Sequence, residues 1–249
     1  MNKGPHISIK PEHLLDLFGF PLTNSFLTAI IVLLLFVLTT IYYNSQLKKV
    51  KRSNFFYLLQ FIFKGIYNFF KTVLGTRIDD LFPLIASLFI YILLLNWFGL
   101  LPGVGSILIS VRENQGESHF VPLLRGNTTD LNTTLVLAVV AFSSIQYYGI
   151  KGLGLAGYLG KFFNFSNPIS LVTGLLEVIS EFSRIISFAF RLFGNIFAGE
   201  VILSIIAFLI PVLVSFPFLL LEIFVGFIQA FVFAMLTAVF INLATMKAH

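Results

Sequence analysis

Long apolar runs separated by short polar segments dominate the chain. Three of them, at residues 22–43, 81–101 and 131–150, are each long enough for a transmembrane helix, which needs about 20 residues. Asp79 and Asp80 precede the second run, where acidic side chains suit the positive end of a helix dipole. The pattern predicts an all-α integral membrane protein with about five membrane helices.

The two longest predicted helices lie in the C-terminal part, at residues 168–210 and 217–245. A continuous helix over the first of these ranges would be roughly 65 Å long, about twice the hydrocarbon thickness of a bilayer. The range could therefore form two spans that turn near GNIFAG, or one strongly tilted helix. Because no proline or hydrophilic loop interrupts it, we expect the tilted helix. Pro211 and Pro217 then bracket a turn, so that both long helices form a hairpin.

Residues 52–77 follow a different pattern, because Lys64, Lys71 and Arg77 interrupt the apolar sequence at intervals. Such spacing suits a helix that lies along the membrane surface with its charged side chains in water. We therefore expect an amphipathic interfacial helix on the cytoplasmic side, in addition to the spanning helices.

The charges between the apolar runs predict how the chain is oriented. Basic residues gather at residues 48–52, directly after the first run, and such clusters favour the cytoplasmic side. The segment 1–21 and the hydrophilic connection at 106–130 are then external, and the C-terminus is cytoplasmic. The N-terminal segment lacks the basic-then-apolar arrangement of a cleaved signal peptide, so we expect the first run to remain as an anchor.

Composition strengthens the membrane interpretation and excludes several kinds of site. Of the 249 residues, 57% are hydrophobic and only 11% are charged, against about 25% charged residues in soluble domains. The absence of cysteine excludes disulfides and thiolate metal sites. The net charge is +5, and the Lys and Arg residues lie mostly between the apolar runs. This placement indicates that the basic residues set the orientation of the chain in the membrane and do not bind nucleic acid. No G-x-x-x-x-G-K-[ST] phosphate loop occurs, so we expect neither a nucleotide site nor enzymatic activity.

Five polar side chains share one face of the predicted helix at 168–210. At 100° per residue, Glu177, Glu181, Arg184, Arg191 and Asn195 fall within a narrow stripe. Glu181 and Arg184 are three residues apart and can pair with each other. For these two, a purely structural ion pair and a functional role are both open.

Arg191 differs from Arg184 because no carboxylate lies within four positions of it in either direction. A charge at mid-membrane costs from a few to more than about 10 kcal/mol, so an unpaired one predicts a functional site. Arginine also stays protonated under essentially all conditions, which makes it a fixed positive charge. We expect its counter-charge to be an acidic group that comes from elsewhere and moves.

Further polar residues suggest a second pocket. Glu222 and Gln229 lie about 20° apart on the final helix, with Gly226 on the same face. Glu200 lies about 140° from Glu177 if the helix is unbroken, so it faces a different cavity. Two polar pockets on either side of Arg191 suit a divided proton path. The alternative is that Glu222 and Gln229 merely hydrogen-bond neighbouring helices.

Several motifs together carry a family resemblance. With RLFGNIFAGE and the downstream GFIQAF, the chain resembles subunit a of F-type ATP synthases, the membrane stator beside the rotating c-ring. NWFGLLPG is similar to the end of that family's second span, TDLNTTLVLA to the start of its third, and NPISLVTGLLEVIS to the start of its long arginine-bearing helix. HISIKPEHLLDLFGFPLTN is similar to the N-terminus of bacterial members, so the resemblance covers nearly the whole chain.

The resemblance implies roles for individual residues. Arg191 matches the essential stator arginine that faces the mid-membrane carboxylate of each c subunit, and Gln229 matches the polar residue beside it. Three further residues match positions of the half-channel that opens to the outside, namely Asn195, Glu200 and Glu222. Glu177 matches an acidic position of the cytoplasmic half-channel. The Glu222 position is His in some members, with compensating changes at the Glu200 position, so the two acids could titrate as a coupled pair. Further candidates are Glu181, Arg184 and Asp130.

The resemblance also implies partners and a location. The partners are the c-ring, the peripheral-stalk b subunits, other ATP synthase subunits, the lipid bilayer and protons, with no nucleic acid, cofactor or metal. The location is the bacterial inner membrane. The alternatives are a self-contained secondary transporter or ion channel, which usually has internal repeats that we do not find, and a structural scaffold. Because the family's ion selectivity resides mainly in the c subunit, the choice between H⁺ and Na⁺ stays open.

Overall fold

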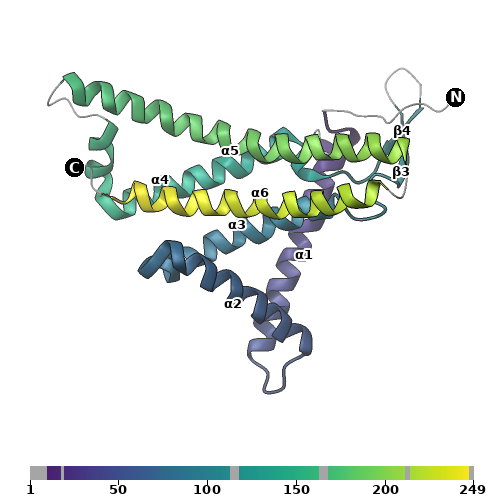
Figure 1. Ribbon diagram of the computed structural model, residues 1–249, viewed down its shortest axis with the longest axis horizontal. Coiled ribbons are helices and arrows are strands. Elements are labelled where there is room, and N and C mark those ends of the chain that lie inside the picture. Colours follow the sequence, from purple (N-terminus) through teal and green to yellow (C-terminus); the bar gives the residue numbers. More distant parts are fainter. Residues whose placement is uncertain (1–9, 18–19, 113–117, 163–167, 211–213, 247–249) are drawn as a thin grey trace.

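The computed structural model describes residues 10–17, 20–112, 118–162, 168–210 and 214–246, most of which are helical (Figure 1). The helices are α1 (Asn24–Leu47), α2 (Asn54–Leu74), α3 (Ile78–Phe98), α4 (Leu131–Phe162), α5 (Pro168–Leu209) and α6 (Ser215–Ala244). Among the described residues, five helical segments are long and apolar enough to cross a membrane, with α2 and α3 counted as one. The expected all-α membrane class with about five spans is therefore confirmed.

Helices α5 and α6 form an antiparallel hairpin that runs along the whole molecule (Figure 1). α5 is one continuous helix of 42 residues without a turn at GNIFAG, so the single long helix is the alternative that the chain adopts. Gly199 of α5 lies directly against the Glu222 side chain of α6, and both helices carry further small buried residues, namely Ala189 on α5 and Ala230 and Ala234 on α6. Phe188 packs between them, 4.9 Å from the ring of Phe233.

Helices α1 and α2 form an arm that points away from this hairpin, and α3 returns from the arm to the bundle (Figure 1). The chain reverses between α2 and α3 at Gly75, whose φ of 57° disfavours residues with a side chain. Phenylalanine rings close the junction, because buried Phe70 of α2 lies 6.2 Å from both Phe89 of α3 and Phe231 of α6. The core then continues along α3, whose Ile92 is fully buried.

Helix α4 extends beyond the third expected span because it kinks and folds back. Gly154 has φ 74° and ψ 160° inside the helix, a conformation that residues with a Cβ adopt only with strain. After the kink, the ring of Tyr158 lies against Gly149, where an added Cβ would come within 2.5 Å of a ring carbon. The carbonyl of Phe162 similarly contacts Gly174 of α5. The end of α4 is thereby docked on its own first half and on α5.

The described residues contain two short hairpins that the sequence analysis did not predict, and the strands at residues 108–112 and 118–122 lie at the end of the molecule where α5 approaches α6 (Figure 1). β1 (His13–Leu17) pairs antiparallel with β2 (Phe20–Thr23), and β3 (Leu108–Arg112) with β4 (Ser118–Pro122). The third and fourth strands belong to the connection at 106–130, which the sequence analysis described only as a loop. The remaining parts of the expected external segments, at 1–9, 18–19 and 113–117, lie outside the described residues.

Candidate functional site

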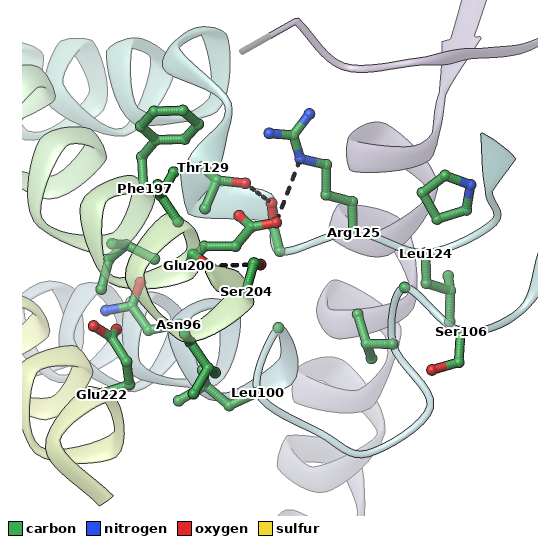
Figure 2. Close-up of a pocket in the computed structure, with 18 of the residues that line it drawn as sticks. Asn96, Leu100, Ser106, Leu124, Arg125, Thr129, Phe197, Glu200, Ser204 and Glu222 are labelled. Atoms are coloured by element: carbon green, nitrogen blue, oxygen red, sulfur yellow. Dashed lines mark hydrogen bonds and ion pairs between the residues drawn. The ribbon is translucent and has the colours of Figure 1, made fainter. Parts of the chain in front are cut away.

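A cavity of about 510 Å³ lies between α3, α5, α6 and the connection that follows β4. We call it the Glu200 cavity. Polar groups from distant parts of the chain line it: Asn96 of α3, Arg125 and Thr129 of the connection, Glu200 and Ser204 of α5, and Glu222 of α6 (Figure 2). The cavity thus brings together Glu200 and Glu222, two of the acids that the sequence analysis singled out.

Glu200 faces a cation that comes from the connection and not from its own helix. Nε of Arg125 lies 3.9 Å from Oε1 of Glu200, and the Arg125 side chain is only 10% exposed (Figure 2). Nη1 of Arg125 also donates a hydrogen bond of 3.0 Å to the carbonyl oxygen of Lys10. Arg125 therefore connects the N-terminal segment, the connection and α5 at the wall of the cavity.

Glu222 enters the same cavity from α6 and is 8% exposed. Its carboxylate lies directly against Gly199, so that a Cβ at position 199 would overlap it. Glycine at this point of α5 is therefore a requirement for the position of Glu222. Because Gly199 is the neighbour of Glu200, the two acids belong to one electrostatic environment, in which like charges repel.

Asn96 is a polar residue of the cavity that the sequence analysis missed. It is 3% exposed, and its Nδ2 donates a hydrogen bond of 2.8 Å to the carbonyl oxygen of Gly226. Its Oδ1 has no hydrogen-bond partner within the described part of the chain, and neither has Oε2 of Glu200. Buried polar atoms in a cavity of this size are suited to bind water. The clue in the sequence was a single asparagine within the apolar run LLLNWF, because intramembrane polar residues are often functional.

A second polar group, the Glu181 cluster, consists of Gln146 and Tyr158 of α4 with Glu181 and Arg184 of α5. Arg184 hydrogen-bonds to Oε1 of Glu181, and Nε2 of Gln146 donates to Oε2 at 3.0 Å. The hydroxyl of Tyr158 donates to Oε1 of Gln146 at 2.5 Å. Glu181 and Arg184 thus form the pair that their spacing predicted, and α4 supplies two partners that the spacing could not reveal. Glu177, one turn before Glu181, is partly exposed.

Arg191 lies between these two groups along α5. It is ten residues from Glu181 and nine from Glu200, which corresponds to about 15 Å and 14 Å along the helix axis. Its Nη2 lies 3.2 Å from Oγ of Ser187, and no carboxylate among the described residues lies within ion-pair distance of it. The structure therefore leaves Arg191 with a hydroxyl neighbour and without a counter-charge in this part of the chain.

Gln229 lies at the level of Arg191 in the hairpin. The contacts of Gly199 with Glu222 and of Phe188 with Phe233 fix the antiparallel alignment of α5 and α6, and this alignment sets Gln229 opposite the residues next to Arg191. Both side chains are partly exposed. The hairpin therefore presents an arginine and a glutamine at about the same height.

Two other candidates lie elsewhere. Asn195 is exposed and is not among the residues that line the Glu200 cavity, although the helical wheel grouped it with buried Glu181. Asp130 is buried and caps α4, because its Oδ1 accepts a hydrogen bond of 2.9 Å from the backbone N–H of Asn132. Its position is explained by the start of that helix. Among the residues that the structure describes, no group of three or more His, Asp or Glu could hold a metal ion.

Comparison with known proteins places these features in a family. A sequence model described as "ATP synthase A chain" matches residues 25–242. The chain belongs to this family. It is 30% identical over 233 residues to the ATP synthase subunit a of Moorella thermoacetica, an alignment that covers 94% of this chain and 95% of the relative. It is 34% identical over 246 residues to the ATP synthase subunit a 3 of Pelobacter propionicus, covering 97% and 94%. The family resemblance seen in the sequence is thereby confirmed.

Proposed function

We propose that this chain is the proton-channel stator subunit a of a bacterial F-type ATP synthase. It couples transmembrane proton flow to rotation of a c-ring and thereby to ATP synthesis. Membership of the ATP synthase A chain family supports this function. The single observation that carries the mechanism is the position of Arg191, a cation without a carboxylate partner among the described residues, midway between two separate polar groups on one continuous helix.

The distance between the two polar groups suits a path divided within a membrane. Nineteen residues separate Glu181 from Glu200, which corresponds to about 29 Å along α5, so the two polar groups are far enough apart to serve separate half-channels. We assign the Glu200 cavity to an outer half-channel and the Glu177 end of α5 to an inner one. α5 and α6 are then inclined in the membrane, with the N-terminus outside and the C-terminus in the cytoplasm.

In this mechanism, protons reach the ring through the Glu200 cavity. Glu200 and Glu222 accept and release them, and water held by Asn96 connects the carboxylates. A carboxylate of the c-ring takes up the proton, becomes neutral and can turn into lipid, where an ionised carboxylate would be too costly. After nearly a full rotation, the carboxylate releases its proton toward the inner half-channel, which Glu177 lines.

Arg191 keeps the two half-channels separate. Its permanent positive charge repels a proton that would cross directly, and it stabilises the ionised carboxylate of the ring as this passes. Gln229, at the same level of α6, adds a polar neighbour without a charge. At about 2.3 kcal/mol per charge per 100 mV, the membrane potential does useful work only while that direct leak is closed.

The surface around Arg191 fits such a partner. Large apolar side chains near it on α5 are more than half exposed, with Ile186 at 57% and Phe190 at 53%. An exposed apolar helix surface close to one cation suits a ring of apolar helices that carry one acid each. The peripheral-stalk b subunits are further partners, and we assign nucleotide chemistry to other subunits of the complex.

The test is ATP-driven proton pumping in inverted membrane vesicles that contain the full complex. Arg191→Ala is expected to abolish pumping, and Arg191→Lys to reduce it strongly because lysine lacks the fixed guanidinium geometry. Ser187→Ala, which removes only the hydroxyl neighbour of Arg191, is the matched control and should pump nearly normally. Normal pumping by Arg191→Ala contradicts the stator function.

A second measurement separates the stator from a self-contained transporter or channel. The purified chain is reconstituted into liposomes alone and together with a c-ring, and proton flux is driven by a potassium diffusion potential. We expect flux only when the ring is present. Rapid flux through the chain alone favours the transporter or channel instead.

A further inference from the structure

The Glu181 cluster contains two residues of α4, Gln146 and Tyr158, to which the stator mechanism gives no role. Resting on the proposed function, we infer that they are positioning residues that hold Glu181 as a fixed anion, so that it neutralises Arg184. Arg191 is then the only cation of α5 that lacks its counter-charge within the chain's described residues. On this inference Glu181 carries no protons, although it lies on the same stripe as Glu177.

With Glu181 ionised, as the inference requires, the hydrogen bonds of the cluster have one consistent direction. An ionised carboxylate can only accept, so the amide of Gln146 must turn its NH₂ group toward Glu181, at 3.0 Å. The amide oxygen then faces Tyr158, whose hydroxyl must donate, at 2.5 Å. Arg184 donates to the other carboxylate oxygen. Each oxygen of Glu181 therefore has a donor, and these hydrogen bonds stabilise the charged form of the carboxylate against the cost of its burial.

Two glycines of α4 allow Tyr158 to reach the cluster. The reversal of α4 at Gly154 requires a φ of 74°, which brings the end of the helix back toward its first half. Gly149 leaves the space that the ring of Tyr158 occupies. Lys161, one turn later, donates a hydrogen bond of 3.0 Å to the carbonyl oxygen of Ala244 at the end of α6. The end of α4 is thus held at both α5 and α6, and it carries Tyr158 to the cluster.

Arg184 has its own reason to need a fixed counter-charge. Its guanidinium lies 4.4 Å from the ring centre of Phe240 and is partly buried, so water screens its charge poorly. It lies two turns from Arg191, on the side of Glu177. Without its partner, Arg184 would add a second positive charge to the inner route and repel protons there. Glu181, held by Gln146, cancels this field.

The test is passive proton conductance through inverted vesicles stripped of the catalytic sector, driven by a potassium diffusion potential. Glu181→Gln is expected to lower the conductance about tenfold, because a fixed charge of one sign changes local ion concentrations by about 10-fold or more. Gln146→Met, which keeps the shape but removes the donor, is expected to lower it severalfold. Tyr158→Phe should cause a smaller decrease, about twofold, since only the orientation of the amide is affected.

The decisive variant removes both charges together. If Glu181 serves only to neutralise Arg184, Glu181→Gln combined with Arg184→Gln should conduct within about twofold of the wild type, because the repulsive field disappears with its source. A proton-carrying Glu181 predicts that the double variant stays as slow as Glu181→Gln alone, and this result overturns the inference. Wild-type conductance in Glu181→Gln, Gln146→Met and Tyr158→Phe also overturns it.

Two controls complete the design. Tyr147→Phe removes a hydroxyl from an exposed tyrosine of the same helix and should conduct normally, and the amount of chain in the membrane is measured for every variant. Arg191→Ala is assayed for ATP-driven pumping in the same membranes before the catalytic sector is removed. Retained pumping by Arg191→Ala counts against the stator function. The comparison of Glu181→Gln with the Glu181→Gln and Arg184→Gln double variant tests the role of the Glu181 cluster separately.

Discussion

The Glu200 cavity and the Glu181 cluster both hold acidic side chains within apolar helices, but they satisfy them differently. In the cavity, Glu200 lies 3.9 Å from its cation and keeps one carboxylate oxygen without a hydrogen bond in the described structure. Glu222 shares the same space of about 510 Å³. In the cluster, both oxygens of Glu181 accept hydrogen bonds, one from Gln146 of α4 and the other from Arg184 of α5.

On the mechanism that we propose, this difference separates acids that exchange protons from an acid that holds its charge. A carboxylate with one oxygen free of hydrogen bonds, beside a cavity large enough to hold water, can accept a proton without first breaking a strong contact. A carboxylate whose two oxygens both accept hydrogen bonds must weaken or rearrange these contacts when it is protonated. Burial alone does not distinguish Glu222 of the cavity from Glu181 of the cluster, because they are 8% and 6% exposed. The hydrogen-bond pattern does.

The largest effect is expected when both acids of the cavity are neutralised. Glu200→Gln combined with Glu222→Gln should lower proton conductance at least about 100-fold, the usual contribution of positioned acid–base groups. Each single substitution should have a smaller effect, because the remaining acid can still exchange protons. The measurement is passive conductance in stripped vesicles. Unchanged conductance in both single variants and in the double variant removes these acids from the proton path.

A substitution that moves Glu222 without changing any charge should come next. Gly199→Ala introduces a Cβ where the Glu222 carboxylate now lies, so that the carboxylate must leave its position beside Glu200. We expect conductance to fall about tenfold, since misplacement of a reacting group by about 1 Å can cost up to 100-fold. Gly65→Ala on α2, where an added Cβ meets nothing within 4 Å, is the matched control. Equal conductance in both variants contradicts this role of Gly199.

The sequence could predict how residues on the same helix lie relative to one another. Helical spacing alone identified the pairing of Glu181 with Arg184 and the isolation of Arg191, because both depend on distances along a single regular element. The absence of proline likewise predicted that α5 is continuous, and the structure agrees. The same geometry grouped Asn195 with Glu181, but a wheel cannot tell which neighbouring helix covers which end of a 42-residue helix.

Residues that approach from other elements were not predictable in this way. Arg125 reaches Glu200 across 75 positions of sequence, and Gln146 reaches Glu181 across 35, so neither contact follows from local spacing. The position of Tyr158 depends on the reversal at Gly154, which the Gly-rich sequence KGLGLAGYLGK marks only as a linker. The strands β3 and β4 were missed because their short pairing is set by the tertiary fold as much as by β-propensity.

The smallest effect is expected at Asp130. This residue follows Thr129, which lines the Glu200 cavity, but Asp130 itself caps α4. Asp130→Ala removes the acceptor for the backbone N–H of Asn132 and should destabilise the protein by about 1 kcal/mol, measured as a lower thermal midpoint in detergent. Asp130→Asn keeps an equivalent cap and removes the charge, so both stability and proton conductance should stay near wild type. A loss of conductance in Asp130→Asn at unchanged stability instead assigns Asp130 to the proton path, because only the ability to ionise differs between the two side chains.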